Sequence, residues 1–227
     1  DRTSSSSRTA SQETSSLPVR LWTFNMNIPM KRLMALLLCA FMLCVEVIHA
    51  AGPDVKTGIE VLRDRDFDAL KGKRVGLVTN PSGVDSQLRS TIDILYNAPG
   101  VNLVALYGPE HGVRGDVYAG GKISDSIDQA TGLPVYSLYG ATRKPTRQML
   151  EGIDVMVYDI QDVGVRSYTY ISTLGLVMEA CGEKGIEVMV LDRPNPLGGN
   201  KIEGCYVEPG FHSFVSQYRI PYVYGLT

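Results

Sequence analysis

The feature that most constrains the fold of this chain is a series of short apolar runs that alternate with segments of helical period. These runs occupy residues 73–79, 101–106, 134–138, 153–158 and 186–191. Apolar side chains recur at helical spacing in residues 90–96 and again in residues 171–181. Strands that are almost continuously apolar, with helices between them, are typical of a parallel sheet covered on both faces. We therefore predict an α/β fold with a mostly parallel sheet and helices on both faces.

Two segments between these runs carry weaker signals. Residues 145–151 are predicted to form a short helix, because Pro145 stands at its start and Gly152 follows its end. Residues 116–132 are polar and rich in glycine, which predicts a long loop. A loop of that length inside a compact domain is usually functional or mobile.

The first 50 residues differ in composition from the rest. Residues 1–29 are rich in Ser, Thr and Arg without an apolar period, which predicts a disordered or mistranslated leader. Residues 30–50 have the layout of a secretory signal peptide, with a basic start, an apolar run and a small-residue cleavage site. The run is too short to favour a membrane span, and a permanent N-terminal anchor is the alternative. We expect residues 51–227 to form one exported domain, periplasmic or secreted.

Composition argues against several classes of function. The chain carries 22 Lys and Arg against 24 Asp and Glu, and this weakly acidic balance argues against non-specific nucleic-acid binding. The three His are isolated and no Cys-x-x-Cys occurs, so we expect no metal and no cofactor. Glycine-rich dinucleotide and phosphate loops are absent from the sequence, as is the Gly-x-Ser-x-Gly turn of esterases.

Polar side chains follow the predicted strands at their carboxyl ends. The loop after the strand at 101–106 places Glu110, His111 and Arg114 among three glycines and a proline. The corresponding positions after the other strands hold Asn80, Asp159, Asp162 and Asp192. In open α/β sheets, ligands bind outside the carboxyl ends of the strands. The sequence therefore predicts an active or binding site at this edge, although solvated turns with local charge pairs are the alternative.

Two carboxylates at one edge suit the acid–base hydrolysis of a glycosidic bond. Glu110 stands in a loop shaped by glycine and proline, beside apolar Leu106 and Tyr107, which suits it to donate a proton. Asp159 or Asp162 could be the second group. The guanidinium groups of Arg114, Arg166 and Arg193 could bind an anionic substrate, and Tyr168 and Tyr170 could stack on a sugar ring.

Each of these residues also has a structural interpretation. Asp162 and Arg166 stand four residues apart and could pair across a first helical turn. Asp192 could form a turn with its own backbone, and Asp159 could cap the following segment. The two tyrosines could be partly core, and His111 could either orient Glu110 or be an ordinary loop residue.

Four blocks of the sequence resemble the signature blocks of the exo-β-N-acetylmuramidases, exported bacterial proteins long catalogued as a domain of unknown function. The blocks are Asn80–Gly83, Tyr107–Gly115, Tyr158–Tyr170 and Leu191–Gly199. They stand in the order found in the family, and the resemblance runs from about Gly58 to the last residue. It implies a Rossmann-like domain that releases N-acetylmuramic acid from the non-reducing ends of peptidoglycan fragments.

The resemblance also implies roles for individual residues. The catalytic glutamate of the family falls at Glu110, and Asp159 and Asp162 both stay candidates for its partner. The substrate-binding candidates are Asn80, His111, Arg114, Arg166, Tyr168, Asp192, Arg193 and Asn195. N-acetylmuramic acid carries a lactyl carboxylate, for which we hypothesise Arg114 or Arg166 as the partner. The expected ligands are peptidoglycan-derived saccharides or muropeptides.

Members of this family are longer and continue into a smaller C-terminal domain. We therefore expect that the chain lacks this domain, and that residues 51–227 are a truncated catalytic domain whose activity is in doubt. Two other readings stay open. The chain could be an exported muropeptide- or sugar-binding module without turnover, or an inactive fragment of the enzyme.

Overall fold

The computed structural model describes residues 29–49, 55–115 and 124–226. The chain divides into two compact units, residues 1–53 and 54–227. The described part of the first unit is the helix α1 (Met30–His49), which covers nearly all of the predicted signal peptide, while the predicted leader lies almost wholly outside the described residues. Within the described ranges, no helix has both the length and the apolar character needed to cross a bilayer.

The second unit is built on one sheet with the strand order β3-β4-β2-β1-β5-β6. Its strands are β1 (Arg74–Thr79), β2 (Asn102–Gly108), β3 (Ser126–Ile127), β4 (Pro134–Ser137), β5 (Val155–Asp159) and β6 (Glu187–Val190). All pairs are parallel except β3 with β4. The predicted α/β fold with a mostly parallel sheet is therefore confirmed. Because β1 pairs with both β2 and β5, the loops after these three strands leave the sheet side by side.

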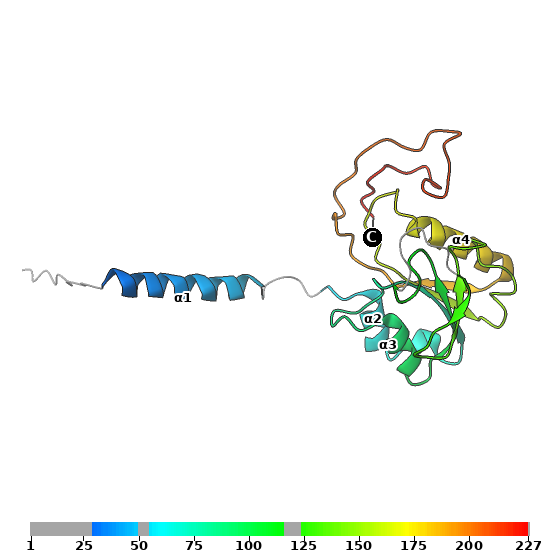
Figure 1. The fold of residues 1–227 in the computed structure, drawn as a ribbon, viewed down its shortest axis with the longest axis horizontal. Coiled ribbons are helices and arrows are strands. Elements are labelled where there is room, and N and C mark those ends of the chain that lie inside the picture. The colour runs from blue at the N-terminus through cyan, green and yellow to red at the C-terminus, as the bar shows by residue number, and fades with distance from the viewer. Residues whose placement is uncertain (1–28, 50–54, 116–123, 227) are drawn as a thin grey trace, which may run out of the picture. The chain divides into compact units, whose positions relative to one another are not determined.

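Different helices cover the two faces of the sheet (Figure 1). The helices of this unit are α2 (Gly58–Asp64), the short 3-10 helix η1 (Asp68–Leu70), α3 (Thr91–Asn97) and α4 (Tyr170–Lys184). Ile59 of α2 and Ile92 of α3 pack with Val75 and Leu77 of β1 on one face. The next residue, Val78, faces the other side, toward the cluster formed with α4. Alternate residues of each strand thus serve opposite layers, as the apolar runs predicted.

The apolar repeat predicted for α4 comprises Ile171, Leu174, Met178 and Cys181. Cys181 is buried and Leu174 packs against the same core cluster, whereas Met178 is 52% exposed. The buried face also contains Val177 and Ala180, which the repeat did not include. The end of α4 is set by Gly185, which adopts the left-handed conformation that suits glycine at a helix C-terminus.

Two local predictions were wrong. Residues 145–151 form turns instead of a helix, because a single backbone bond from Leu150 to Thr146 is not continued. The predicted loop at 116–132 contains the strand β3, paired with β4 through a turn at Asp128, and residues 116–123 of that loop lie outside the described residues. Two-residue strands such as β3 depend on their partner, so an apolar pattern does not reveal them.

The N-terminus of α2 is fixed by a carboxylate, that of Glu60, which accepts hydrogen bonds from within the protein. Glu60 is buried and accepts hydrogen bonds from the backbone nitrogen of Thr57 at 2.8 Å and from its hydroxyl at 2.9 Å. It also accepts from the backbone and hydroxyl of Ser86, in the loop after β1. The hydrogen bond from the Ser86 hydroxyl, together with those from Thr57, lowers the pKa of Glu60 to about 2.

Candidate active site

The Glu110 loop begins where β2 ends. A hydrogen bond of 3.1 Å from the Gly112 nitrogen to the Pro109 carbonyl closes a tight turn around Glu110 and His111. His111 has a φ of +74°, in the left-handed region that residues other than glycine rarely adopt. A side chain at Gly108 would approach the Gly112 Cα to 3.3 Å, so the loop folds closely on the strand. Such strained backbone clusters at functional sites.

Glu110 lines a cavity of about 250 Å³ together with His111 and the segment Ser167–Tyr170. The loops after β2 and β5 therefore build the cavity, as the sequence predicted for this edge of the sheet. Its walls hold one carboxylate, one imidazole and two tyrosines. Tyr168 is 51% exposed and half-buried Tyr170 completes the lining, so neither belongs wholly to the core.

Two tyrosines connect Glu110 to its surroundings. Tyr139 lies just after β4, and burial followed by the charge of Glu110 raises the pKa of its hydroxyl. Burial also raises the pKa of Tyr170, and a hydrogen bond from the Asn80 side chain partly offsets this effect. The other end of Asn80 accepts from the Ser82 nitrogen at 2.9 Å, which fixes the turn after β1.

Asp159 at the end of β5 has no exposed surface and is fully engaged inside the protein. The Arg193 guanidinium donates to both of its oxygens, at 2.6 and 2.9 Å, and the Thr91 hydroxyl also donates to it. Arg193 is itself buried and donates to the Val84 carbonyl at 2.8 Å. The predicted pair of site residues Asp159 and Arg193 is thus brought together, as a bidentate ion pair in the core.

Asp162 lies in a different cavity from Glu110. One carboxylate oxygen accepts from the Gly164 nitrogen at 2.8 Å and from the Tyr224 hydroxyl. The other oxygen, Oδ2, is buried without a hydrogen-bond partner among the described residues. It belongs to a cavity of about 180 Å³ between the end of β5, α4 and the C-terminal segment. Among the described residues, Asp162 and Arg166 do not form the ion pair that was considered for a first helical turn.

Arg114 and Arg166 are both occupied by other parts of the protein. Arg114 donates to Asp128 at 2.6 and 3.0 Å and to Asp93 at 2.9 Å, and these hydrogen bonds raise its pKa further above the ordinary arginine value. Arg166 donates to the carbonyls of Cys205 at 2.8 Å and Ile220 at 2.6 Å. Both guanidinium groups therefore brace the fold, and the geometry leaves the hypothesised lactyl contact without support from either.

The two remaining predicted residues shape the loop after β6. Asp192 is exposed and its carboxylate accepts from the Arg193 nitrogen at 2.9 Å, which is the turn-forming role weighed for it. Asn195 donates to the carbonyls of Tyr224 at 3.1 Å and Leu226 at 2.7 Å. It thereby ties this loop to the C-terminal segment, and neither residue lines the Glu110 cavity.

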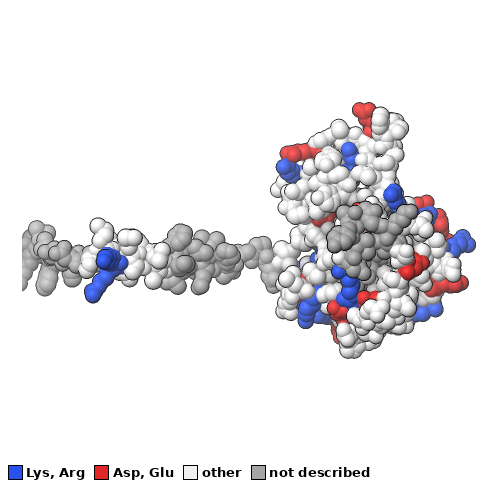
Figure 2. All heavy atoms as spheres, viewed as in Figure 1, with Lys and Arg blue, Asp and Glu red and all other residues white. Residues whose placement is uncertain are grey.

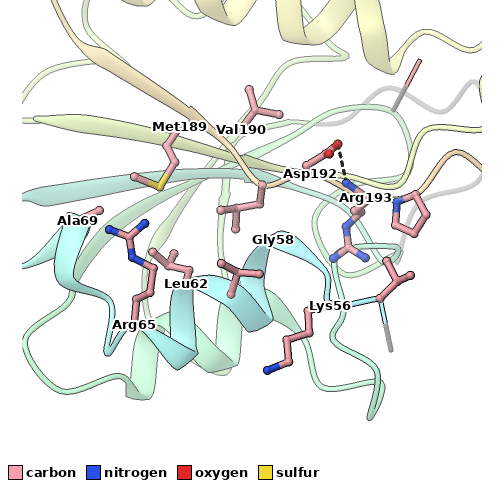
Figure 3. A pocket seen from close by; sticks show the side chains of 13 residues that line it. Lys56, Gly58, Leu62, Arg65, Ala69, Met189, Val190, Asp192 and Arg193 are labelled. Atoms are coloured by element: carbon pink, nitrogen blue, oxygen red, sulfur yellow. Dashed lines mark hydrogen bonds between the residues drawn. The ribbon is translucent and has the colours of Figure 1, made fainter. Parts of the chain in front are cut away.

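A larger cavity, about 590 Å³, lies away from Glu110, between α2 and the edge strand β6 (Figure 3). Leu62 of α2 and Met189 and Val190 of β6 contribute to a mainly apolar lining. Val190 is 49% exposed, so β6 is only partly covered. We assign the candidate site to the smaller cavity, because that one gathers ionisable and aromatic side chains at the carboxyl ends of the strands.

Sequence reasoning missed three residues near Glu110. Tyr139 stands two residues after β4, so the rule that found Glu110 could have found it. The Arg143 guanidinium lies over the rings of Tyr139 and Phe214, and Phe214 comes from the distant C-terminal segment, for which no local signal exists. On the face drawn in Figure 2, acidic and basic side chains are interspersed.

Comparison with known proteins gives concordant matches. Residues 75–227 match the family model described as the N-terminal part of exo-β-N-acetylmuramidase NamZ. The peptidoglycan β-N-acetylmuramidase NamZ of Bacillus subtilis is 56% identical over 178 residues, which are 78% of this chain and 43% of that protein. The chain thus spans less than half the length of this curated relative.

Two crystal structures of DUF1343 family proteins from Bacteroides fragilis also match. One is 67% identical with a TM-score of 0.71, and the match covers 75% of this chain and 43% of that one. The other is 35% identical with a TM-score of 0.65, over 76% of this chain and 44% of that one. Sequence and fold therefore point to the same group of proteins.

Proposed function

The chain belongs to the family of exo-β-N-acetylmuramidase NamZ N-terminal domains, and from this we propose that it supplies the catalytic carboxylate of an exo-acting glycoside hydrolase. The proposed reaction releases N-acetylmuramic acid from the non-reducing ends of peptidoglycan fragments. The observation that carries this proposal is the position of Glu110. Among the carboxylates predicted for this edge of the sheet, it is the one that lines a cavity together with an imidazole and tyrosine rings.

Glu110 is the proposed general acid of the reaction. Hydrolysis of a glycosidic bond requires a carboxylic acid that protonates the leaving oxygen as the bond breaks. The charge of Glu110 acts on the hydroxyl of Tyr139, whose pKa is raised by burial and by this charge. Tyr168 and Tyr170 in the cavity wall offer aromatic faces against which a sugar ring can pack.

For the second carboxylate we favour Asp162 over Asp159. Both oxygens of Asp159 are held by Arg193, whereas Oδ2 of Asp162 has no partner among the described residues. A buried polar atom without a partner is rare and calls for an explanation such as a catalytic role. Asp162 lines another cavity than Glu110, so this assignment requires a substrate that reaches both.

Substitution of the proposed acid tests this function. In the Glu110→Gln variant we expect kcat for a chromogenic β-N-acetylmuraminide to fall by a factor of about 100 or more. The dissociation constant of N-acetylmuramic acid should change little, because glutamine keeps the size and polarity of the side chain. The N-acetylglucosaminide counterpart should not be cleaved by either form.

A matched control is Glu203→Gln, which removes an exposed carboxylate paired with Lys201. It should leave kcat and binding unchanged. Equal kcat for wild type and Glu110→Gln would contradict the proposed acid, and binding without any turnover in the wild type would favour the non-catalytic binding module.

A further inference from the structure

Arg143 lies on an aromatic seat made by two distant parts of the chain. Its guanidinium carbon is 4.1 Å from the ring centre of Phe214 and 5.6 Å from that of Tyr139. The two rings are themselves 6.4 Å apart. A guanidinium stacked on aromatic faces is held in a defined plane, while the N–H groups at its edge can still donate to a carboxylate. The side chain is exposed, so a ligand can reach it.

The same seat lies near the proposed catalytic carboxylate. Tyr139 carries the Arg143 guanidinium on its ring, and after burial the charge of Glu110 is the next cause that raises the pKa of its hydroxyl. One tyrosine therefore separates the cation from Glu110. A substrate whose scissile bond lies at Glu110 can place a substituent of the same sugar ring near Arg143.

Arg143 also differs in charge balance from Arg114 and Arg193, which are both paired with carboxylates. Arg114 is paired with Asp128 and Asp93, Arg193 is paired with Asp159, and Arg166 is bound to backbone carbonyls. Within residues 55–115 and 124–226, Arg143 forms no salt bridge. Its charge is thus available to an anionic ligand from outside the protein.

We propose that Arg143, seated on Tyr139 and Phe214, is a specificity-determining residue that binds the lactyl carboxylate of the muramyl residue. This inference rests on the proposed function. It assigns to Arg143 the contact first hypothesised for Arg114 or Arg166. The guanidinium donates two parallel hydrogen bonds to the carboxylate, and the rings beside it cover the apolar side of the lactyl group.

The test compares a charged and an uncharged substrate. Wild type, Arg143→Met and Arg143→Lys are assayed with the chromogenic β-N-acetylmuraminide and with the same compound carrying its lactyl group as an amide. For the charged substrate, Arg143→Met should raise KM about 10- to 100-fold while kcat changes little. Arg143→Lys should lose less, because it keeps the charge without the planar fork.

The amide substrate isolates the contact. Wild type should lose about the same factor on the amide, whereas Arg143→Met should treat both substrates alike. The control is Arg147→Met, an exposed arginine without an aromatic seat, which should keep the wild-type preference. An equal loss on both substrates in Arg143→Met would overturn the proposal.

Binding measurements separate failure of this inference from failure of the proposed function. Wild type and Arg143→Met are titrated with N-acetylmuramic acid and with its lactyl amide. A preference for the acid that vanishes in Arg143→Met, without turnover in the wild type, would support the Arg143 contact and reject the hydrolase. Turnover without such a preference would reject the contact alone.

Discussion

Asp159 and Glu110 follow two strands that flank β1 in one sheet, yet their carboxylates have opposite surroundings. Asp159 is completely buried, and an arginine and a threonine donate to its oxygens. Glu110 lies half-buried in the wall of a cavity. Two carboxylates at the same edge of the sheet thus have different roles. Asp159 stabilises the fold, and we propose that Glu110 takes part in catalysis. The two carboxylates differ in burial: Asp159 is enclosed with Arg193, whereas Glu110 borders a cavity.

The largest expected effect is on stability, at Asp159. The Asp159→Asn variant leaves Arg193 buried without its counter-charge, so the free energy of unfolding should fall by about 3–5 kcal/mol. Urea denaturation followed by circular dichroism measures this loss. Asp154→Asn is the matched control, because it breaks an exposed pair with Arg74 and should cost far less stability than Asp159→Asn. Similar losses in both variants would contradict the structural role of Asp159.

Asp162 is the intermediate case, since one oxygen is satisfied and the other is not. If Asp162 is the second catalytic group, Asp162→Asn should lower kcat at least tenfold. The free energy of unfolding should fall by about 1–2 kcal/mol at most. Tyr224→Phe, which removes the hydroxyl that donates to Asp162, separates the structural part of this effect. A kcat that falls only in proportion to the folded fraction would show that Asp162, like Asp159, has a structural role.

The smallest expected effect concerns Glu60, another carboxylate whose charge is used by the fold. Its pKa of about 2 lies below the usual value of about 4.3 in an unfolded chain. Its contribution to stability is therefore fully present above about pH 4.3 and is lost as the pH falls toward 2. Glu60→Gln should cost about 1 kcal/mol at pH 6, and this difference from wild type should shrink with acidification. Parallel stability curves for the two proteins would contradict the assignment.

The sequence predicted the layers of this fold better than the partners of its charges. The apolar runs at 73–79 and 153–158 correspond to β1 and β5. Both strands are buried on their two faces, and such strands contain few polar residues. The strand β3 and the turns at 145–151 were not predicted. Both segments are too short to show an apolar period.

The sequence predicted polar side chains at the edge of the sheet where the Glu110 cavity lies, but it did not predict which of them are enclosed in the core. Position after a strand identified Glu110 and Asp159 equally well. Their difference arises from Arg193, which is 34 residues from Asp159 in sequence and reaches it only once β5 and β6 have paired. The pairing of Arg114 with Asp93 and the stacking of Arg143 on Phe214 likewise depend on tertiary packing, which a local pattern does not encode.

The most direct measurement determines kcat and the free energy of unfolding on the same preparations of Glu110→Gln and Asp159→Asn. We predict a crossed result: Glu110→Gln loses turnover of the chromogenic β-N-acetylmuraminide and keeps the wild-type stability, while Asp159→Asn loses stability and keeps turnover in proportion to its folded fraction. A Glu110→Gln protein that turns over normally, or an Asp159→Asn protein of wild-type stability without turnover, would contradict this division between chemistry and structure.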